Sequence, residues 1–332
     1  MHAFLIEWLL CPNCHGDLSW RLDERDGSHI EAGVARCQEC NTEYPIRDGL
    51  GLFLLPDLPR DDLWRTVDSA LIGYLNDNPQ IEHQLMDVPL ASLGSADQFF
   101  RAMVLEERGD FQGAAEAEAL AHEGLYNAGA RACADSQVEY VVNLVAQHEG
   151  PIVDLASGRG RLVKQLARLP DRTVVASDFS PRVLRRNRRW LKQLGLDNRV
   201  SLLAFDARRT PFRDKALPLL TSYVGLPNIE SPGELLVELR RIVAGLFVAV
   251  SHFYPPDDEA NGQALRKAGL DELLFKEPAL ARFAGSGWQV DVANSCHSLA
   301  RPTPKGVVIE GAGIDGLPVA DTVLEWCVLV AT

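Results

Sequence analysis

The chain has 332 residues, of which 46% are hydrophobic, and its formal net charge is −13. This length can bury one large core with a smaller unit beside it. The sequence has no run near the roughly 18 apolar residues that a membrane-spanning helix needs. The acidic charge argues against a general polyanion binder, because affinity for nucleic acids rests largely on Lys and Arg. Residues 3–10 lack a basic leader, so we expect a globular, cytoplasmic protein with no membrane partner.

Two Cys-x-x-Cys motifs lie near the start of the chain. Cys11 and Cys14 form the first, and Cys37 and Cys40 form the second, with 22 residues (15–36) between them. Each motif offers two thiolates from one tight turn, so together they predict a tetrahedral site for a structural Zn²⁺. Four thiolate ligands leave no open position for a catalytic water. Disulfides and a redox role are the alternatives, and a reducing compartment disfavours disulfides.

The sequence around these motifs also carries a family resemblance. Residues 10–18 (LCPNCHGDL) surround the first motif, and residues 44–49 (YPIRDG) follow the second. Over residues 5–57 the chain resembles the small zinc-ribbon proteins that activate certain tRNA and release-factor methyltransferases, and the ribbons fused to rRNA guanine methyltransferases. A ribbon of this size cannot build much core, so we expect metal binding to supply most of its folding free energy, on the order of 10 kcal/mol. We assign residues 1–57 to a zinc ribbon.

Helical periodicity dominates the next segment. No glycine-rich linker interrupts it, so we predict a helical linker or cap over residues 58–133 rather than a flexible tether. The candidate helices cover residues 61–75, 97–108, 113–123 and 134–147.

Three apolar runs then lead to aspartates. They are residues 152–155 with Asp154, residues 173–177 with Asp178, and residues 201–205 with Asp206 and the small Ala207. The first run opens into a glycine-rich turn in which Gly158 and Gly160 allow backbone N–H groups to approach a ligand. Asp178 follows Asp154 by 24 positions, which suits an acid that accepts the ribose hydroxyls of a nucleotide. The carboxyl ends of parallel strands meet at one edge of a sheet, so these features predict a nucleotide-cofactor site.

This series resembles the class I S-adenosylmethionine-dependent methyltransferases over residues 124–332. Residues 154–160 (DLASGRG) match the family's glycine-rich motif, and residues 177–182 (SDFSPR) match its ribose-binding acid and the helix start behind it. The resemblance implies S-adenosylmethionine as the cofactor. The residues that it implies in cofactor binding are Asp154, Ala156, Ser157, Gly158, Gly160, Asp178, Phe179, Asp206, Ala207 and Ser222.

The resemblance also assigns roles and contains two departures. It implies that Asp154 reaches the ammonium of the cofactor, and that Tyr126 either closes over the cofactor or is a core tyrosine in a turn. Ala156 stands where the family usually has its first glycine. Leu217-Pro218 replaces the usual Phe-Asp at the start of the fourth strand.

A nicotinamide-dependent enzyme is the nearest rival, because it shares the sheet and the ribose-binding acid. Such an enzyme normally has glycine at all three fingerprint positions, whereas Ala156 occupies the first here. Residues 311–316 (GAGIDG) also fit the dinucleotide pattern. Pro318 follows at once and no amphipathic helix opens behind it, so we reject this second match.

The sequence gives less information on the residues that bind the methyl acceptor. The predicted fourth strand leads into residues 223–229 (YVGLPNI), where the family places the transferring methyl group. Tyr223 and Asn228 are candidates to orient an acceptor or to stabilise this loop. His252 follows the fifth strand and is either a base that titrates near neutral pH or a structural histidine. No catalytic residue is assigned beyond these candidates.

Two further segments have open interpretations. The basic residues between positions 182 and 192 lie on one predicted helix, for which a solvated face is favoured over an RNA contact. Residues 301–317 form a proline- and glycine-rich insert between the last two strands. It is predicted to be part of the acceptor pocket or a subunit contact.

Together these features predict an α/β protein with a doubly wound, seven-stranded, mostly parallel sheet in residues 134–332, an N-terminal zinc ribbon and a helical cap. The favoured function is methyl transfer from S-adenosylmethionine to a small-molecule acceptor. The acidic charge supports that acceptor class, while the ribbon favours the alternative of an rRNA or tRNA methyltransferase. A non-catalytic scaffold with a degenerate fold is the third class. The sequence does not predict the oligomeric state.

Overall fold

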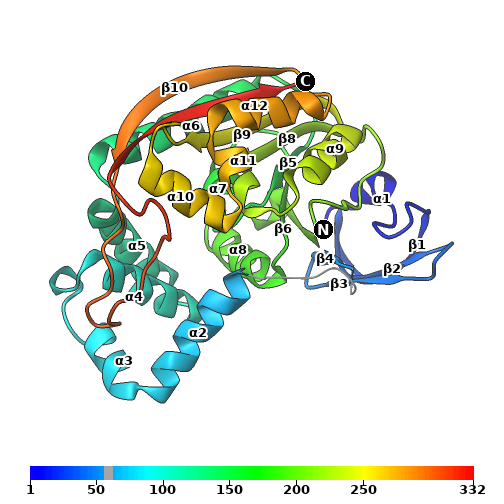
Figure 1. The fold of residues 1–332 in the computed structure, drawn as a ribbon. Coiled ribbons are helices and arrows are strands. Elements are labelled where there is room, and N and C mark those ends of the chain that lie inside the picture. Colours follow the sequence, from blue (N-terminus) through cyan, green and yellow to red (C-terminus); the bar gives the residue numbers. More distant parts are fainter. Residues whose placement is uncertain (56–62) are drawn as a thin grey trace.

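The computed structural model describes residues 1–55 and 63–332, with side chains described for residues 1–55 and 70–332. Figure 1 shows one sheet crossing the molecule. Its strand order is β1-β2-β3-β4-β7-β6-β5-β8-β9-β11-β10. The strands are β1 (Leu18–Asp26), β2 (His29–Cys37), β3 (Glu43–Arg47), β4 (Leu50–Phe53), β5 (Ile152–Leu155), β6 (Val174–Asp178), β7 (Val200–Phe205), β8 (Leu217–Tyr223), β9 (Val243–Phe253), β10 (Val290–Ala300) and β11 (Thr322–Ala331). The α-helices are α1 (Leu5–Trp8), α2 (Leu63–Asp77), α3 (Pro79–Met86), α4 (Ser95–Glu107), α5 (Phe111–Leu125), α6 (Ala128–Ala146), α7 (Arg161–Leu166), α8 (Pro181–Gln193), α9 (Pro232–Ile242), α10 (Glu259–Ala268), α11 (Asp271–Leu274) and α12 (Lys276–Gly285).

The strands from β7 to β10 in this order form the predicted doubly wound unit. β7, β6, β5, β8 and β9 are parallel, and β11 runs antiparallel between β9 and β10. The seven strands predicted for residues 134–332 are present as β5 to β11, and the sheet as a whole has eleven strands among the described residues. The four additional strands belong to the N-terminal ribbon, which continues the same sheet.

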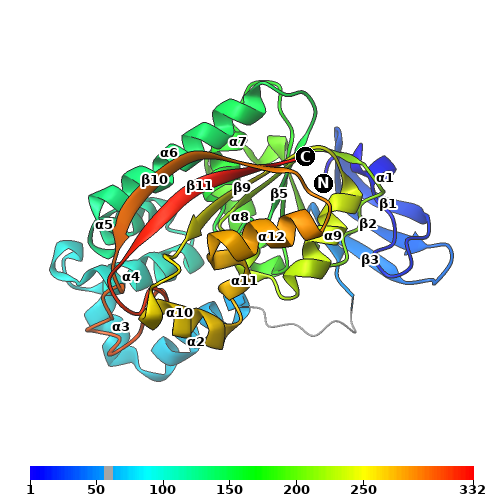
Figure 2. The same ribbon diagram turned by 45° about the horizontal axis from the view of Figure 1, so that its top comes forward.

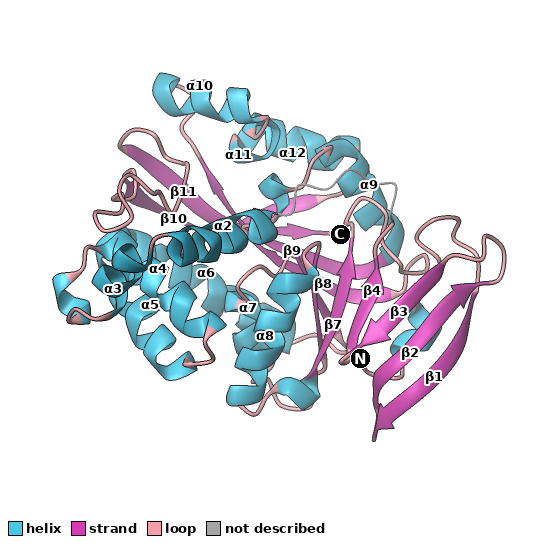
Figure 3. Ribbon diagram, turned by 90° about the horizontal axis from the view of Figure 1, so that it is seen from below, coloured by secondary structure: helices cyan, strands magenta, loops and turns pink. Residues whose placement is uncertain are grey.

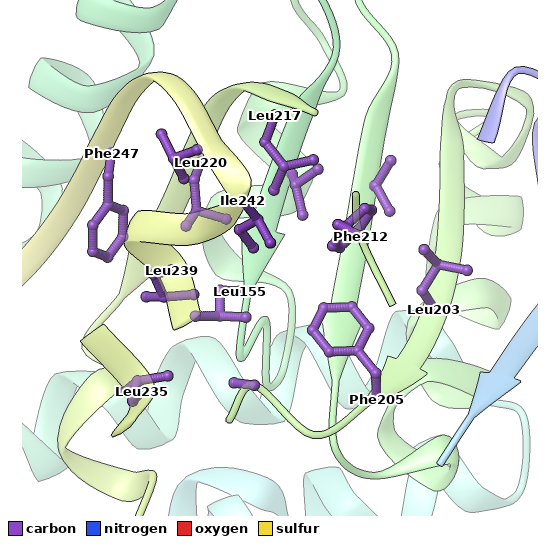
Figure 4. Packing of buried hydrophobic residues seen from close by; sticks show 14 of the residues in the cluster. Leu155, Leu203, Phe205, Phe212, Leu217, Leu220, Leu235, Leu239, Ile242 and Phe247 are labelled. Carbon is purple, nitrogen blue, oxygen red and sulfur yellow. The ribbon is translucent and has the colours of Figure 1, made fainter. Parts of the chain in front are cut away.

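Helices cover both faces of the parallel strands, as Figure 2 shows. α6, α7 and α8 pack on one face, and α9 and α12 pack on the other. The parallel strands are buried on both faces, which explains their continuous apolar runs. Figure 4 shows this packing on the α9 face, where the labelled side chains are Leu155, Leu203, Phe205, Phe212, Leu217, Leu220, Leu235, Leu239, Ile242 and Phe247.

Pro218 lies in the central strand β8, where a proline is unusual because it lacks a backbone donor. The pairing of β8 with β5 begins one residue later, at Leu219. The register between β8 and β9 shifts at the same point, between Leu217 and Leu219. A Cβ atom on Gly245 would lie 2.2 Å from the Pro218 carbonyl oxygen, so only glycine fits there. A bulge beside a glycine therefore accommodates this departure from the family pattern.

The ribbon joins the sheet through β4 (Figure 3), which pairs in parallel with β7. The register runs from Leu50 opposite Leu202 to Phe53 opposite Phe205. Tyr44 and Phe53 stack at 5.3 Å between ring centroids and belong to the same buried cluster as Phe205. The ribbon thus covers a sheet edge that would otherwise present unpaired backbone groups.

Helices α2 to α5 form the predicted cap. The candidate helix at residues 61–75 is α2 from Leu63 onward, while residues 61 and 62, like the predicted domain limit at 57/58, lie outside the described residues. The insert after β10 runs down to α4 (Figure 1), where the buried Asp97 carboxylate accepts hydrogen bonds from the backbone of residues 307–309 at 2.8–3.1 Å. Ile309 completes the apolar core of the cap.

α6 extends without a break across the predicted limit at 133/134. It begins at Ala128, six residues before the predicted helix start, because the Asn127 side chain caps it by accepting from Ala130 N at 3.0 Å. None of the described helices, α6 included, is long and apolar enough to span a membrane.

The basic helix α8 has the solvated face that was predicted at Arg185, Arg189 and Lys192, which are exposed, but two of its other arginines bind carboxylates of distant elements. Arg186 is 6% exposed and bonds the buried Glu106 of α4, with Nε donating to Oε2 at 2.6 Å. Arg188 pairs with Glu31 of the ribbon at 2.7 Å. These two contacts could not be predicted, because both partners are distant in sequence. α8 is the surface on which the cap and the ribbon dock.

Candidate functional site

The glycine-rich turn after β5 has a left-handed backbone at three positions. Ala156, Gly158 and Gly160 have φ angles of 51°, 48° and 74°. Ser157 N donates to the Ser177 carbonyl at 2.8 Å, which fixes the turn against β6. Residues with positive φ direct successive N–H groups toward one side, so the turn can cradle an anionic or polar ligand group.

A cavity of about 430 Å³ opens at the carboxyl edge of β5, β6, β7 and β8, within the size range of small-molecule sites. Seven of the predicted cofactor residues line it, namely Ala156, Ser157, Gly158, Asp178, Phe179, Asp206 and Ala207. The candidate acceptor residues Tyr223 and Asn228 line it too. The sheet therefore brings together most of the residues singled out from the sequence. The four that are not part of the cavity wall are Asp154, Gly160, Ser222 and His252.

Asp178 ends β6 at the cavity wall and is held by backbone donors. Gly158 N donates to Oδ2 and Ser180 N donates to Oδ1, both at 2.9 Å. These bonds stabilise the ionised form of the carboxylate and fix its orientation before a ligand arrives. A carboxylate held in this way can accept hydrogen bonds from two vicinal hydroxyls, so the position fits a ribose.

Asp206 directly follows β7 and is paired with the nearby Arg208. Arg208 Nε and NH2 donate to its two carboxylate oxygens at 3.0 and 2.7 Å, and Arg208 also contacts Glu230 at 2.9 Å. Its hydrogen bonds to Asp206 raise the pKa of Arg208. An adenine amino group would share Asp206 with this guanidinium. Sequence reasoning missed Arg208, whose only sequence signal is its position two residues after the acid.

Asp154 lies beneath the turn and is 1% exposed. Its Oδ1 accepts a hydrogen bond from Thr221 Oγ1 at 2.7 Å. Burial raises the pKa of Asp154 to about 7. Ser222 is equally buried and donates to the Leu155 carbonyl at 3.0 Å. Both residues form the floor below the turn, and their direct contact with the cofactor remains a prediction.

The β8 end of the cavity combines an aromatic ring with two arginines that sequence reasoning missed. The Arg161 guanidinium lies 5.4 Å from the centroid of the Tyr223 ring. Arg159, which also lines the cavity, donates to Glu118 of the cap at 3.1 Å. Burial raises the pKa of Tyr223, so its phenol is neutral at physiological pH. Arg159 occupies a variable position of the glycine motif and Arg161 is the first residue of α7, and neither position gave a signal in the sequence.

His252 packs beside Trp326 at 5.1 Å between ring centroids. Burial lowers the pKa of His252 to about 4, and its Nδ1 has no hydrogen-bond partner among the described residues. A neutral imidazole of such low basicity is a weak proton acceptor. Its catalytic role therefore remains a prediction.

The four cysteines of the ribbon meet at one point. Their Sγ atoms all lie within 4.8 Å of one another, with Cys14 and Cys37 at 3.4 Å and Cys11 and Cys40 at 3.6 Å. Tetrahedral Zn–S bonds of about 2.3 Å require S···S separations of about 3.8 Å, close to these values. The backbone N–H groups of Glu39 and Cys40 point at Cys37 Sγ, both at 3.4 Å, and stabilise a thiolate there. The donor set and its spacing fit a structural zinc ion.

Comparison with known proteins agrees with this geometry. Residues 152–245 match the family described as "Methyltransferase domain", and residues 2–49 match the family described as "Trm112p-like protein". A demethylmenaquinone methyltransferase from Thermus thermophilus is 38% identical over 117 residues, which cover 35% of this chain and 52% of that protein. A ubiquinone/menaquinone biosynthesis C-methyltransferase from Stutzerimonas stutzeri is 28% identical over 122 residues, which cover 36% and 48%.

The chain thus spans about half the length of these two curated relatives. The solved structure of the YcgJ protein from Bacillus subtilis aligns with a TM-score of 0.47 at 12% identity, over 59% of this chain and 97% of that one. The strand order, the ligand-sized cavity, the four-cysteine cluster and the two family matches agree with one another. The chain therefore combines an N-terminal Trm112p-like zinc ribbon with a class I S-adenosylmethionine-dependent methyltransferase domain.

Proposed function

We propose that this protein transfers a methyl group from S-adenosylmethionine to a small-molecule acceptor. One observation carries the proposal: a single cavity is lined by Asp178, Asp206, the glycine-rich turn and Tyr223. The sulfonium methyl is already activated, so catalysis depends mainly on in-line positioning, worth about 7–11 kcal/mol in well-oriented reactions. A pre-formed cavity supplies such positioning.

Residues at the ends of different strands would bind different parts of the cofactor. Asp178 would accept the ribose hydroxyls, and Asp206 with Ala207 would contact the adenine. The turn at Ser157 and Gly158 would hold the methionine part through backbone N–H groups. This division leaves the methyl group facing β8, where Tyr223 lies.

We infer an aromatic acceptor. The two curated relatives are named for quinone substrates. The β8 end of the cavity offers the Tyr223 ring, the Arg161 guanidinium and the apolar Ile229 as surfaces for a flat ring. An aromatic ring would meet the stacking surface and the guanidinium of Arg161, which is also paired with Asp135 at 2.6 Å.

The RNA alternative has less support. Arg186 and Arg188 of the basic helix form ion pairs with Glu106 and Glu31, so these two cations are not available to bind phosphate groups. The net charge of −13 acts in the same direction. We also infer a cytoplasmic location, because a tetrathiolate metal site suits a reducing compartment.

Calorimetric titration of S-adenosylmethionine into Asp178→Ala tests the cofactor site. We expect the affinity to fall at least tenfold, since hydrogen bonds to a charged group contribute about 1.5–3 kcal/mol each. Asp171→Ala is the matched control, because this exposed aspartate lies in the turn before β6, away from the cavity lining. Equal affinities for Asp178→Ala and the wild type would show that the ribose assignment is wrong.

Transfer of a labelled methyl group tests the reaction itself. The acceptor panel contains a prenylated 1,4-naphthohydroquinone, simple catechols, and total RNA at two salt concentrations. We expect label in an aromatic small molecule and none in RNA. Label in RNA with a steep salt dependence would favour the RNA alternative, and cofactor retention without any transfer would favour the scaffold.

A further inference from the structure

A tyrosine and a carboxylate from distant parts of the chain meet beside the β8 end of the cavity. Tyr126 lies between α5 and α6, and Asp315 lies in the insert between β10 and β11. The Tyr126 hydroxyl donates to Asp315 Oδ2 at 2.7 Å. Sequence reasoning left Tyr126 as a cofactor contact or a core residue, and it singled out Asp315 only within a rejected dinucleotide pattern.

A series of ring contacts links this pair to the cavity wall. The His122 ring lies 5.6 Å from the Tyr126 ring and 6.3 Å from the Phe99 ring. Arg159, which lines the cavity, places its guanidinium 5.0 Å from the centroid of Phe99. Tyr126 also lies within electrostatic reach of Tyr223 and Arg161, the two residues that form the β8 end of the cavity.

The Asp315 carboxylate is available to a ligand. Its Oδ1 accepts no hydrogen bond from any described residue, and the side chain keeps contact with solvent. Burial nevertheless raises the pKa of Asp315. Asp315 is an exposed residue outside the cavity lining, and the raised pKa makes its carboxylate a stronger base than an ordinary aspartate.

The insert that carries Asp315 is fixed in place. Asp97 of α4 binds three consecutive backbone N–H groups at residues 307–309, and Ile309 is buried in the cap. Asp315 N donates to Thr303 Oγ1 at 3.4 Å, across the base of the loop. The carboxylate is thus pre-organised by the cap rather than carried on a free loop.

We infer that Asp315, oriented by Tyr126, is the proton acceptor for the hydroxyl group of a phenolic acceptor bound between Tyr126 and Tyr223. This inference rests on the methyl transfer proposed above. In this division of roles, the cap and the insert recognise the acceptor. The glycine-rich turn, Asp178 and Asp206 bind the cofactor.

The chemistry balances without any further reactant. The O–H bond of the acceptor breaks and its proton passes to Asp315 Oδ1. The ring carbon next to the oxygen then forms a bond to the methyl carbon, while the C–S bond breaks and its electron pair stays on sulfur. The hydrogen of that ring carbon leaves as a proton to water, and the oxygen regains its proton from Asp315. The sulfonium becomes a neutral thioether.

The charged and titratable groups around Asp315 determine the expected pH dependence. They are Tyr126, His122 and Tyr254, with Arg161 near Tyr126. The hydrogen bond from Tyr126 lowers the pKa of Asp315, against the larger effect of burial. Only ionised Asp315 can accept a proton, so kcat falls as the pH drops below its pKa. Removing the Tyr126 hydroxyl raises the pKa of Asp315. The fall of kcat on the low-pH side of the profile, its acidic limb, then moves to higher pH.

The test is a pH profile of kcat for Asp315→Asn, Tyr126→Phe and the wild type, with the naphthohydroquinone as acceptor. We expect Asp315→Asn to lose at least 100-fold in kcat and to lose the acidic limb, since a general base contributes about 10²–10⁴-fold. Tyr126→Phe should keep the limb but shift it to higher pH. Asp321→Asn is the matched control, because this exposed aspartate of the same segment pairs with the exposed Arg301 and, among the described residues, with no other side chain.

Cofactor affinity separates this inference from the function on which it rests. Asp315→Asn should bind S-adenosylmethionine as the wild type does. An active wild type with an unchanged profile in Asp315→Asn would overturn the role of Asp315 and leave the proposed function standing. A wild type that binds cofactor but methylates no phenol would overturn both the acceptor class and the base.

Discussion

Ala156 holds a backbone conformation that costs most non-glycine residues free energy. Its φ angle is 51°, and the left-handed region costs about 1–2 kcal/mol for an L-residue with a Cβ atom. Gly225 leaves room for the Ala156 methyl group, because a Cβ atom on Gly225 would lie 2.7 Å from the Ala156 Cβ. The Ala156 side chain, which replaces the usual glycine of the family, is thus accommodated by Gly225 in the loop after β8.

We therefore expect Ala156→Gly to stabilise the protein by up to about 1 kcal/mol. This value is the relieved backbone strain minus the cost of the greater conformational entropy that glycine gives the unfolded chain. Chemical denaturation measures this change. Ala115→Gly is the control, because Ala115 is exposed within α5 and should lose about 0.5–1 kcal/mol on the same substitution. If both variants lose equal stability, Ala156 is not strained.

The residues of the site differ in how well the sequence predicts them. Asp178 and the four cysteines were predictable, because their spacing reflects a ligand that the local chain must reach. The partner of Asp206 was not, since an ion pair with Arg208 depends on how the loop folds back. The pKa of Asp154 depends on burial below the turn, which no local pattern reveals.

At the scale of elements, the cap is held on the methyltransferase domain by a buried charge cluster between α4 and α8. Glu106 is 3% exposed and accepts hydrogen bonds from Arg186 and from Trp190 Nε1, the latter at 2.7 Å. Arg159 of the glycine-rich turn contacts the same carboxylate at 3.3 Å. One carboxylate therefore joins the cap, α8 and the wall of the cofactor cavity.

We expect Glu106→Gln to destabilise the protein by about 3–5 kcal/mol, because it leaves Arg186 buried without its counter-charge. Glu107→Gln provides the control, since Glu107 pairs with Arg182 at the surface and should change stability by about 1 kcal/mol or less. Denaturant unfolding of both variants gives the comparison. A similar loss for the two variants would mean that the buried cluster does not hold the cap.

The elements themselves were largely predictable, and their docking was not. The helical cap, the parallel strands and the insert follow from periodicity and turn residues. That Arg186 and Arg188 bind carboxylates of the cap and the ribbon could not be predicted, because basic residues on one helix are typical of a solvated face. Their partners Glu106 and Glu31 lie 80 and 157 residues away.

At the scale of the whole molecule, the ribbon and the methyltransferase domain share one sheet and one core. The two N-terminal residues are part of this junction: the Met1 ammonium donates to the carbonyls of Ile30 and Gly49, and His2 N donates to Ser201 Oγ of β7. Tyr44, Phe53 and Phe205 are in the same buried cluster. The sequence predicted a ribbon and a sheet as separate units, since a strand pairing between them leaves no local signal.

This continuity makes zinc relevant to the stability of the whole protein. The ribbon is too small to fold on its core alone, and metal binding supplies on the order of 10 kcal/mol in such units. Its unfolding would uncover the β7 edge and the buried face of Phe205. We therefore expect Cys37→Ser, or chelation of the metal, to lower the melting temperature of the entire molecule in a single calorimetric transition.

Cys296→Ser is the control for this experiment, because Cys296 lies in β10, outside the cysteine cluster, and a serine hydroxyl can still accept from Gln137 Nε2. Its melting temperature should stay within a few degrees of the wild type. If zinc removal instead gave two calorimetric transitions, and the larger one kept its melting temperature, the pairing of β4 with β7 would contribute little to the stability of the methyltransferase domain. A joint loss would show that the shared sheet couples the metal site to the cofactor edge, since β7 carries both the ribbon and Asp206.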